Sequence, residues 1–543
     1  MILMARPFNA RFAEQPSDVH ISRSTFSLDH NVITSFNVGD LIPVTFMEVV
    51  AGDTFNVDVS QIARLTALKT PVMGDMCLDY FCFYSPFRTL WNHYKEFFGE
   101  NTTGPWFPNV DYEMPHVLAD KPYTHDQLGA YFAEPQGVTG LKSNAMPYRM
   151  YYDVYNNYFR DENIQSPVLI ERGDSEVKAS ALPNGGKPLK ACKFHDYFTS
   201  CLPSPQRGPA VSIGLGGLIP VRAVENKGAE LGSQGAGLKF KYINGESVTV
   251  ARPLQVDGAG TLYPEKVSTT PTPFSPALYP SNLYADLSLA TTLSIDQFML
   301  SYATQRYYQA LARSGGRYFE QLDSLFGVDV NPLQIDIPEF LGGTSVNINI
   351  NQVIQQSETA TTPLGTLAGV SLTGSSDCMF TKSFTEPGLI MIFAVARYRH
   401  VYQQGQQRFM RKKDLLDFYN PIFANIAEQP VYKSEIFATG TDEDNKVFGY
   451  NEAWADYRSI TNKVTGMMNS KSSTPLDMWH WADVYESAPS LSSEWLIESE
   501  APVDRTLDVT SKLNDQIMLD SMFYVKATRV MPYYSVPSLY GHM

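Results

Sequence analysis

Three adjacent charged residues, Arg160, Asp161 and Glu162, follow a run of tyrosines in the stretch FRDENIQSPV. Paired carboxylates can hydrolyse a glycosidic bond when they face each other across a cleft at a defined separation. Asp161 and Glu162 are neighbours in sequence, and neighbours on a helix point in different directions. The pattern therefore favours a structural joint, in which the charged side chains cap a helix end and pair with another segment or subunit.

The alternative is a carbohydrate-active or glycan-binding β-sandwich protein. In that interpretation Asp161 or Glu162 supplies the acid or base, and Trp479 and Trp481 of DMWHWADVY form a platform for a sugar ring. Aromatic residues two positions apart more often lie on one face of a strand or in a packed loop. The glycan hypothesis is therefore the second choice.

The segment RYRHVYQQGQQRFMRKK, residues 397–413, contains six basic residues and no acidic one, with tyrosine and phenylalanine interleaved. Cations that follow phosphates and rings that stack on bases suit single-stranded nucleic acid. Salt bridges to an acidic neighbouring subunit explain the same pattern equally well. The tail from Ser521 to Met543 also lacks acidic residues. The candidate contact residues are Arg397, Arg399, Arg408, Arg411, Lys412, Lys413, Lys526 and Arg529.

Composition and motifs exclude several classes of function. The net charge of −15 argues against a protein whose whole surface binds nucleic acid. No HExxH, P-loop, GxSxG or GxGxxG motif occurs, and the nine histidines include no pair four residues apart. The five cysteines form no CxxC, so neither a zinc site nor a disulfide framework is indicated, and a reducing compartment fits best. We expect no enzymatic activity, no metal site and no cofactor.

Membrane insertion is not expected either. The opening MILM is too short for the apolar region of a signal peptide, which needs about 7 to 15 residues. The longest apolar run, LIMIFAVA at Leu389–Ala396, falls well short of the roughly 20 residues that span a bilayer. This run is predicted to be a buried strand.

The elements that must position these residues are mainly β. Two β runs separated by an AGD turn, within residues 37–62, are predicted to form a strand pair, and residues 76–87 form a strand buried on both faces. A helix is expected at 86–99, and two more at 294–314 and 317–327. Strands return at 344–350, 388–402 and 515–532. Strands near both ends of the chain must share one core, which favours a jelly-roll sandwich.

One segment of the chain has a different composition. Residues 203–280 contain 11 glycines and 10 prolines, well above the usual combined share of roughly 12%. Such a stretch is predicted to be a surface excursion with short strands of its own rather than part of the core.

The order of several stretches resembles the major capsid protein of gokushoviruses, a branch of the small single-stranded-DNA microviruses of bacteria. The resemblance runs from Arg23 to about Leu496, and its stretches are RSTFSLDHNVITSFNVGDLIPV, YNNYFRDENIQ, CLPSPQRGPAV, GGRYFEQLDSLFGV, IPEFLGGTSVNINI, FYNPIFANIAEQPVY and LDMWHWADVYESAPSLSSEWL.

The resemblance implies that residues 1–543 are a single capsid subunit with an eight-stranded antiparallel jelly roll, long inserted loops and several helices. It implies a T=1 icosahedral shell around circular single-stranded DNA, without enzymatic activity. The segment 208–292 would form a protrusion at the threefold axes that contacts a host-surface receptor. A small basic DNA-packaging protein would be a partner, and the subunit would be part of a virion assembled in the bacterial cytoplasm.

Overall fold

The computed structural model describes residues 22–100, 112–211, 295–358 and 363–534, together with six short strands between Val221 and Ala285. The chain divides into two compact units. One contains Met1–Arg207 and Leu311–Met543, and the other contains Gly208–Ala310. The predicted excursion at 208–292 lies within the second unit, and its place on a symmetry axis stays a prediction.

The first sheet of the large unit joins the two ends of the chain. Its strand order is β1-β22-β4-β18, and β2 also pairs with β22. Because β1 and β2 pair with successive parts of β22, they form one interrupted edge strand. The neighbouring first and last strands agree with the sequence prediction. The bounds are β1 Arg23–Ser27, β2 His30–Phe36, β4 Thr54–Leu65, β18 Thr373–Ser383 and β22 Ile517–Val530.

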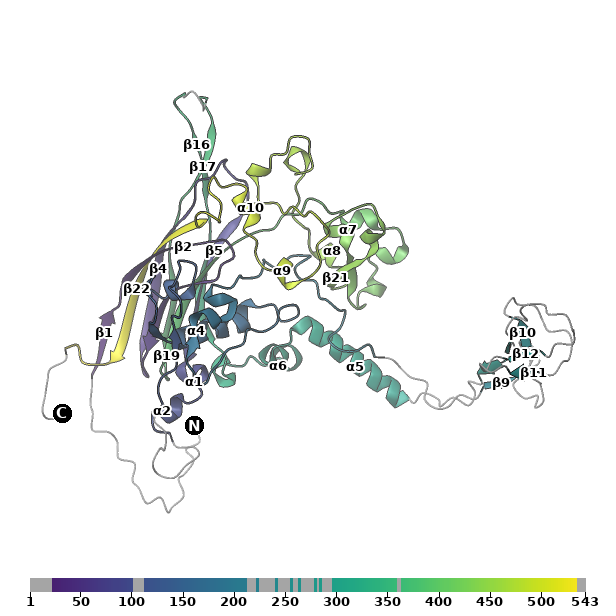
Figure 1. The fold of residues 1–543 in the computed structure, drawn as a ribbon, viewed down its shortest axis with the longest axis horizontal. Coiled ribbons are helices and arrows are strands. Elements are labelled where there is room, and N and C mark those ends of the chain that lie inside the picture. Colours follow the sequence, from purple (N-terminus) through teal and green to yellow (C-terminus); the bar gives the residue numbers. More distant parts are fainter. Residues whose placement is uncertain are drawn as a thin grey trace, which may run out of the picture. The chain divides into compact units, whose positions relative to one another are not determined.

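The second sheet has the order β15-β5-β19-β3, and every pairing in both sheets is antiparallel. Successive strands alternate between the two sheets except where β5 leads to β15, which is the connection pattern of a jelly roll. The predicted mainly β, antiparallel sandwich is confirmed (Figure 1). Each sheet has four strands when β1 and β2 are counted as one. The bounds are β3 Ile42–Val49, β5 Met76–Pro86, β15 Glu339–Asn347 and β19 Gly388–Tyr398.

Two local predictions were wrong. The runs β3 and β4 are strands, but they belong to different sheets and do not pair, because the turn at Asp53 carries the chain across the sandwich. The expected helix at 86–99 is two short helices, α1 Phe87–Leu90 and α2 Tyr94–Phe97. They are separated at Trp91, which is extended, fully buried and donates its indole N–H to Asp174 at 2.6 Å.

Two apolar layers stabilise the sandwich. The first lies between the sheets, and the second lies on the outer face of the β15-β5-β19-β3 sheet, where α4 Met146–Val154 covers it (Figure 1). β5 is buried on both faces as predicted, and the predicted buried strand β19 is likewise covered on both faces. By contrast, β4 and β22 alternate between buried residues and residues that are half-buried or exposed, so the outer face of their sheet is open.

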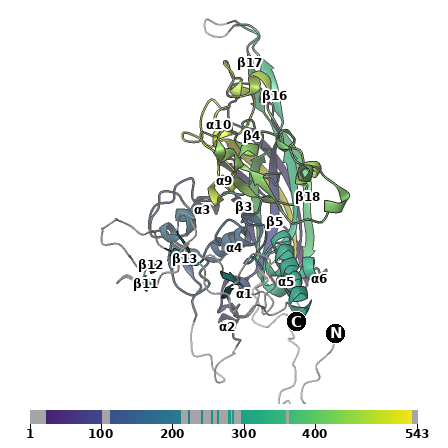
Figure 2. The same ribbon diagram turned by 90° about the vertical axis from the view of Figure 1, so that its right-hand side faces the viewer.

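The remaining elements lie in insertions between strands. A long segment between β5 and β15 holds β6 His116–Leu118, α3 Leu128–Tyr131, β7 Lys142–Asn144, α4, β8 Val177–Lys178, α5 Ile295–Ser314 and α6 Tyr318–Phe326. The short strands of the second unit are β9 Val221–Ala223, β10 Phe240–Tyr242, β11 Leu254–Val256, β12 Leu262–Pro264, β13 Leu278–Pro280 and β14 Leu283–Ala285. A hairpin of β16 Ile350–Ile354 and β17 Leu367–Ser371 projects beyond the sheets (Figure 2).

The segment between β19 and β22, Arg399–Gln516, is called the distal insertion below. It contains β20 Gln429–Tyr432, α7 Lys433–Ile436, β21 Val447–Asn451, α8 Ala455–Arg458, α9 Ser493–Leu496 and α10 Ala501–Asp504. It includes most of the predicted basic segment, and its small apolar cluster is shared with Tyr197, Phe198 and Cys201.

Candidate functional site

The charged stretch at Arg160 lies where a helix ends. Helix α4 continues into a π-helical turn at Tyr155–Phe159, and Arg160 has extended backbone angles. Asp161 accepts hydrogen bonds from the backbone N–H groups of Asn163 and Ile164, at 2.9 and 3.0 Å. Its carboxylate is thus used to organise the turn.

Glu162 and Arg160 connect this turn to the start of α6. The Glu162 carboxylate accepts the backbone N–H of Gly316 and pairs with Arg207 at 3.2 Å. The Arg317 guanidinium donates to the Arg160 carbonyl at 2.7 Å. Arg160 itself donates to the Gln165 carbonyl at 2.7 Å, within its own chain. These contacts have the geometry of a joint between two helices.

The aromatic pair does not form a sugar platform. The Trp481 side chain is only 2% exposed, packs into the core between the sheets and donates to the Thr506 hydroxyl at 3.1 Å. Trp479 lies at the end of a short 3-10 helix two residues earlier. The packed-loop interpretation fits these positions, and the glycan-binding alternative has no support.

Five of the eight candidate cations have an acidic or polar partner within the chain. Arg397 pairs with Asp79 at 2.6 Å and lies over the Phe194 ring. Arg529 pairs with Asp53 at 3.0 Å. These two residues tie strand ends of the sandwich to neighbouring segments.

The other three paired cations lie in the distal insertion. Arg408 pairs with Glu435 at 3.1 Å, and the Glu435 side chain is only 2% exposed. Lys412 pairs with Asp456 at 2.6 Å, and Arg411 donates to the Asp444 carbonyl at 3.0 Å. No local pattern reveals these pairs, because the partners lie between 27 and 44 positions further along the chain.

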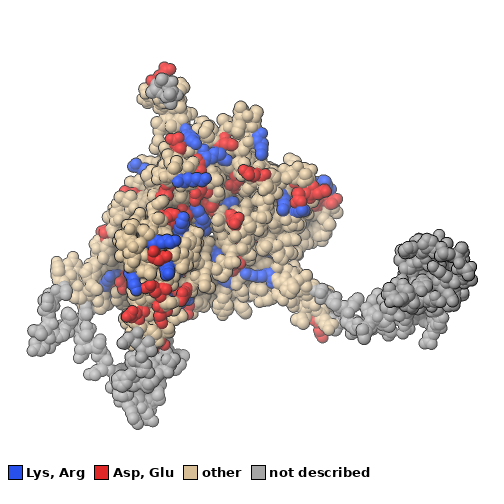
Figure 3. Space-filling view, in the orientation of Figure 1, with Lys and Arg blue, Asp and Glu red and all other residues tan. Residues whose placement is uncertain are grey.

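Arg399, Lys413 and Lys526 are exposed, and no described residue forms a salt bridge with them. Arg399 lies 5.9 Å from the Phe194 ring. On the face shown in Figure 3, basic and acidic side chains are interspersed rather than gathered into a basic patch. The predicted basic surface is therefore reduced to three accessible cations.

A buried charge cluster was missed by sequence reasoning. His400 lies between Asp483 and Glu498, at 2.8 and 2.9 Å, and all three side chains are 6% exposed or less. Burial lowers the pKa of His400, but the two carboxylates outweigh it and raise that pKa to about 9. Burial raises the pKa of Asp483, and the charge of His400 more than reverses this. The partners are 83 and 98 residues away in sequence, so no local pattern reveals them.

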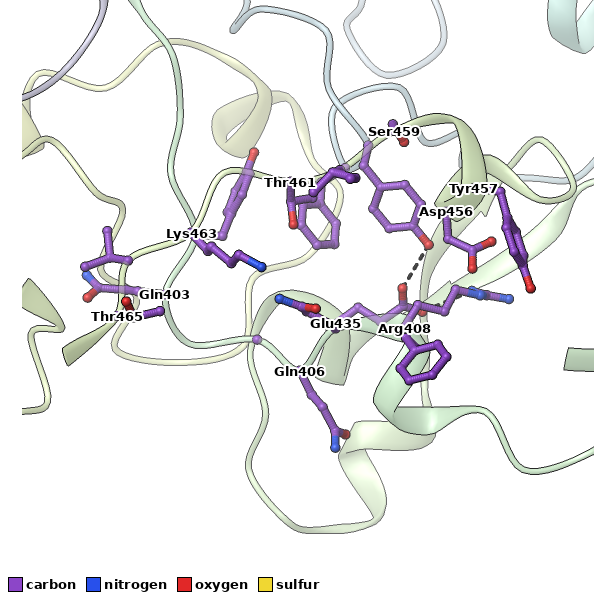
Figure 4. Close-up of a pocket in the computed structure, with 18 of the residues that line it drawn as sticks. Gln403, Gln406, Arg408, Glu435, Asp456, Tyr457, Ser459, Thr461, Lys463 and Thr465 are labelled. Carbon is purple, nitrogen blue, oxygen red and sulfur yellow. Dashed lines mark hydrogen bonds and ion pairs between the residues drawn. The ribbon is translucent and has the colours of Figure 1, made fainter. Parts of the chain in front are cut away.

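A cavity of about 410 Å³ opens beside Arg408 in the distal insertion. Arg408 and Glu435 form one wall, where the Tyr197 hydroxyl donates to Glu435 at 2.8 Å. Figure 4 shows Lys463 extending into the cavity from another wall. The buried ions neutralise each other, so the cavity offers an aromatic, polar lining rather than a reactive centre.

Two other kinds of site are absent from the described ranges. No group of three His, Cys, Asp or Glu residues there could hold a metal ion. No helix in the same part of the chain is long and apolar enough to cross a membrane.

A jelly-roll sandwich with large insertions is the architecture of viral capsid subunits, and lectins and cupins share it. The chain belongs to the family described as capsid protein (F protein), whose sequence model matches residues 15–539. Its role in that family is structural, as a component of the capsid. The predicted resemblance to gokushovirus capsid proteins is confirmed.

Three relatives match almost from end to end, and each is named capsid protein VP1. The protein of Spiroplasma virus 4 is 36% identical over 533 residues, covering 96% of both chains. That of Bdellovibrio phage phiMH2K is 32% identical over 547 residues, covering 100% of both. That of Chlamydia phage 1 is 31% identical over 586 residues, covering 97% of both.

Proposed function

We propose that this chain is the single building block of a T=1 icosahedral shell that encloses a circular single-stranded DNA genome. The observation that carries the proposal is the match to phage capsid proteins over nearly the whole chain. In this proposal the subunit has no enzymatic activity, binds no cofactor, and becomes part of a virion assembled in the cytoplasm of the bacterial host.

The exposed surface supports repeated association. Large apolar side chains are exposed in the β16–β17 hairpin, the α5–α6 region and the distal insertion. Exposed apolar patches of this kind are typical of protein contacts. Many moderate interfaces in one shell add up to a stable particle although each is weak enough to be corrected during assembly.

In this proposal two proteins contact the DNA: the acidic capsid subunit and a small basic packaging protein. The chain carries a net charge of −15, and the three accessible cations of the candidate set, Arg399, Lys413 and Lys526, neutralise few phosphates. A small, very basic packaging protein supplies the remaining positive charge. The three cations then make local contacts to DNA inside the shell.

The segment 208–292 is proposed to form the protrusion at the threefold axes and to contact a receptor on the host surface. Its high glycine and proline content and its separation as part of a compact unit support an independent role. Removing 208–292 should abolish attachment to host cells and leave particle assembly intact. Loss of both would mean that the segment is part of the shell contact itself.

Electron microscopy of the purified chain, with its basic partner and circular single-stranded DNA, tests the main proposal. We expect closed particles of one size, each containing sixty subunits as T=1 symmetry requires. A chain that stays a folded monomer under all assembly conditions would contradict the proposal.

A further inference from the structure

An arm of the distal insertion exposes an unusual number of large apolar side chains. The arm runs from Arg408 to Phe423 and contains three short 3-10 helices, Arg408–Arg411, Leu415–Asp417 and Pro421–Phe423. Six large apolar side chains on it, between 47 and 86% exposed, are called the apolar ridge: Phe409, Met410, Leu415, Leu416, Tyr419 and Ile422.

The backbone of the arm is held in place, so the exposure of the ridge is not that of a loose loop. The Asn420 side chain caps the last 3-10 helix by accepting the N–H of Ile422 at 3.0 Å. Asp417 accepts the N–H groups of Lys413 and Asp414 at 2.9 and 3.0 Å. The Trp454 indole N–H donates to the carbonyl of Phe423 at 2.9 Å.

Three of the four cations of the arm contact the rest of the insertion, while the apolar side chains are exposed to solvent. Arg408 and Lys412 pair with Glu435 and Asp456, and the Lys412 side chain is 5% exposed. Arg411 lies over the Tyr432 ring at 4.4 Å. The surface that a partner would contact is therefore mostly apolar, although residues 408–413 include four basic side chains.

We propose that the apolar ridge is a contact surface for a second copy of this chain in the shell. The inference rests on the proposed function, since it names which surface joins neighbouring subunits. Side chains of this size and exposure offer on the order of 100 Å² each. Six of them provide most of the roughly 800 Å² that one partner contributes to a standard interface.

Charge favours a second copy over the other candidate partners. DNA requires clustered accessible cations, yet Lys413 is the only exposed cation among the described residues of the arm, and it lies beside exposed Asp414. A very basic packaging protein requires clustered acids, which the ridge also lacks. A shell subunit meets other copies of itself at high local concentration, and desolvating an apolar surface on both sides is favourable.

The test replaces Leu415 and Ile422 with glutamate in the full chain, under conditions in which the unchanged chain forms particles. Buried carboxylates without partners oppose association, whereas on the isolated subunit both positions are exposed to water. We expect at least a tenfold lower particle yield in sedimentation and micrographs, with an unchanged unfolding midpoint of the free subunit. The matched control, Leu415→Met with Ile422→Met, should retain particles.

Two results would overturn the inference. Normal particle yield for the glutamate variant excludes the ridge as a subunit contact, and normal yield with less DNA assigns it to nucleic acid. If the unchanged chain forms no particles, the proposed function fails instead, so the two failures are distinguishable.

A second measurement remains valid if the glutamate variant folds poorly. A photo-crosslinking amino acid at position 422 of the otherwise unchanged chain should yield a covalent product of two subunits in assembled particles. Crosslinks only to DNA or to the packaging protein, or none, would contradict the inference.

Discussion

The sandwich and the distal insertion are stabilised in different ways. Between its sheets the sandwich has a continuous apolar core, and strands such as β19 are buried along nearly their whole length. The distal insertion packs on a smaller apolar cluster that it shares with residues 197–201, and its segments are joined by buried ions such as the His400 cluster and the Arg408–Glu435 pair.

The two kinds of stabilisation suit two tasks of a shell subunit, which are to provide a stable base and to hold contact surfaces in one conformation. An apolar core tolerates changes in detail as long as volume and pattern are kept. A buried ion has a specific partner, and the loss of one leaves the other uncompensated. The sandwich thus provides a stable base, while the insertion depends on particular side chains to keep the contact surfaces in one conformation.

The largest expected effect is the loss of His400. Its replacement by leucine leaves Asp483 and Glu498 buried without their cation, at a cost of about 3 to 5 kcal/mol in unfolding free energy. Urea-induced unfolding of the unassembled subunit measures the change. The control is the triple variant with His400→Leu, Asp483→Leu and Glu498→Met. Because no charge then remains unpaired in the cluster, the triple variant should recover at least half of the loss.

A deletion in the sandwich core should have a similar or somewhat smaller effect. Ile392 on β19 is fully buried, and Ile392→Ala should cost roughly 2 to 5 kcal/mol through lost burial and a residual cavity. The matched variant Ile392→Val should cost about 0.5 to 1.5 kcal/mol. Calorimetry of the subunit can measure both. In the sandwich, the loss of unfolding free energy should therefore grow with the number of side-chain atoms removed. At His400, it should instead depend on whether the two carboxylates are left without their cation.

The third prediction concerns pH. The pKa of His400 is raised from 6.5 to about 9, so its stabilisation is fully present below pH 6.5 and is lost as pH rises through 9. Between pH 7 and 10 the unfolding free energy should fall by on the order of 2 to 3 kcal/mol. Repeating the urea series in the triple variant isolates the effect, and an equal loss there would assign it to other groups.

Much of the sandwich was predictable because its signals are local. The apolar run at Leu389–Ala396 and the alternation in β4 report burial directly. The partner of each strand is less visible: β3 and β4 have the pattern of a hairpin, yet the turn at Asp53 carries the chain between sheets.

The charged sites were harder to predict because their partners are distant. The six basic residues at 397–413 indicated a basic surface, but Asp79, Glu435 and Asp456 neutralise three of them within the chain. Sequence composition gives the number of charges, whereas function depends on which ones remain accessible. The joint at Arg160–Glu162 was easier to predict than the long-range ion pairs, since the polar groups at a helix end need partners close by in the sequence.

The smallest effect on stability is expected at the three exposed cations. Arg399, Lys413 and Lys526 form no salt bridge with the described residues, so replacing all three with glutamine should change the unfolding free energy by less than about 0.5 kcal/mol per site. If they contact packaged DNA, particles should form in normal yield but contain less DNA, which a lower ratio of ultraviolet absorbance at 260 and 280 nm would show.

The matched control for these cations removes the same charge from elsewhere on the surface. Lys178, Lys471 and Lys512 are also exposed, and glutamine at these positions gives an identical net charge. Reduced DNA content in the first triple variant but not in the second assigns the loss to position rather than to total charge. Equal DNA content in both variants would mean that these three cations do not bind the genome. The basic packaging protein would then neutralise the DNA, and the acidic shell would only enclose it.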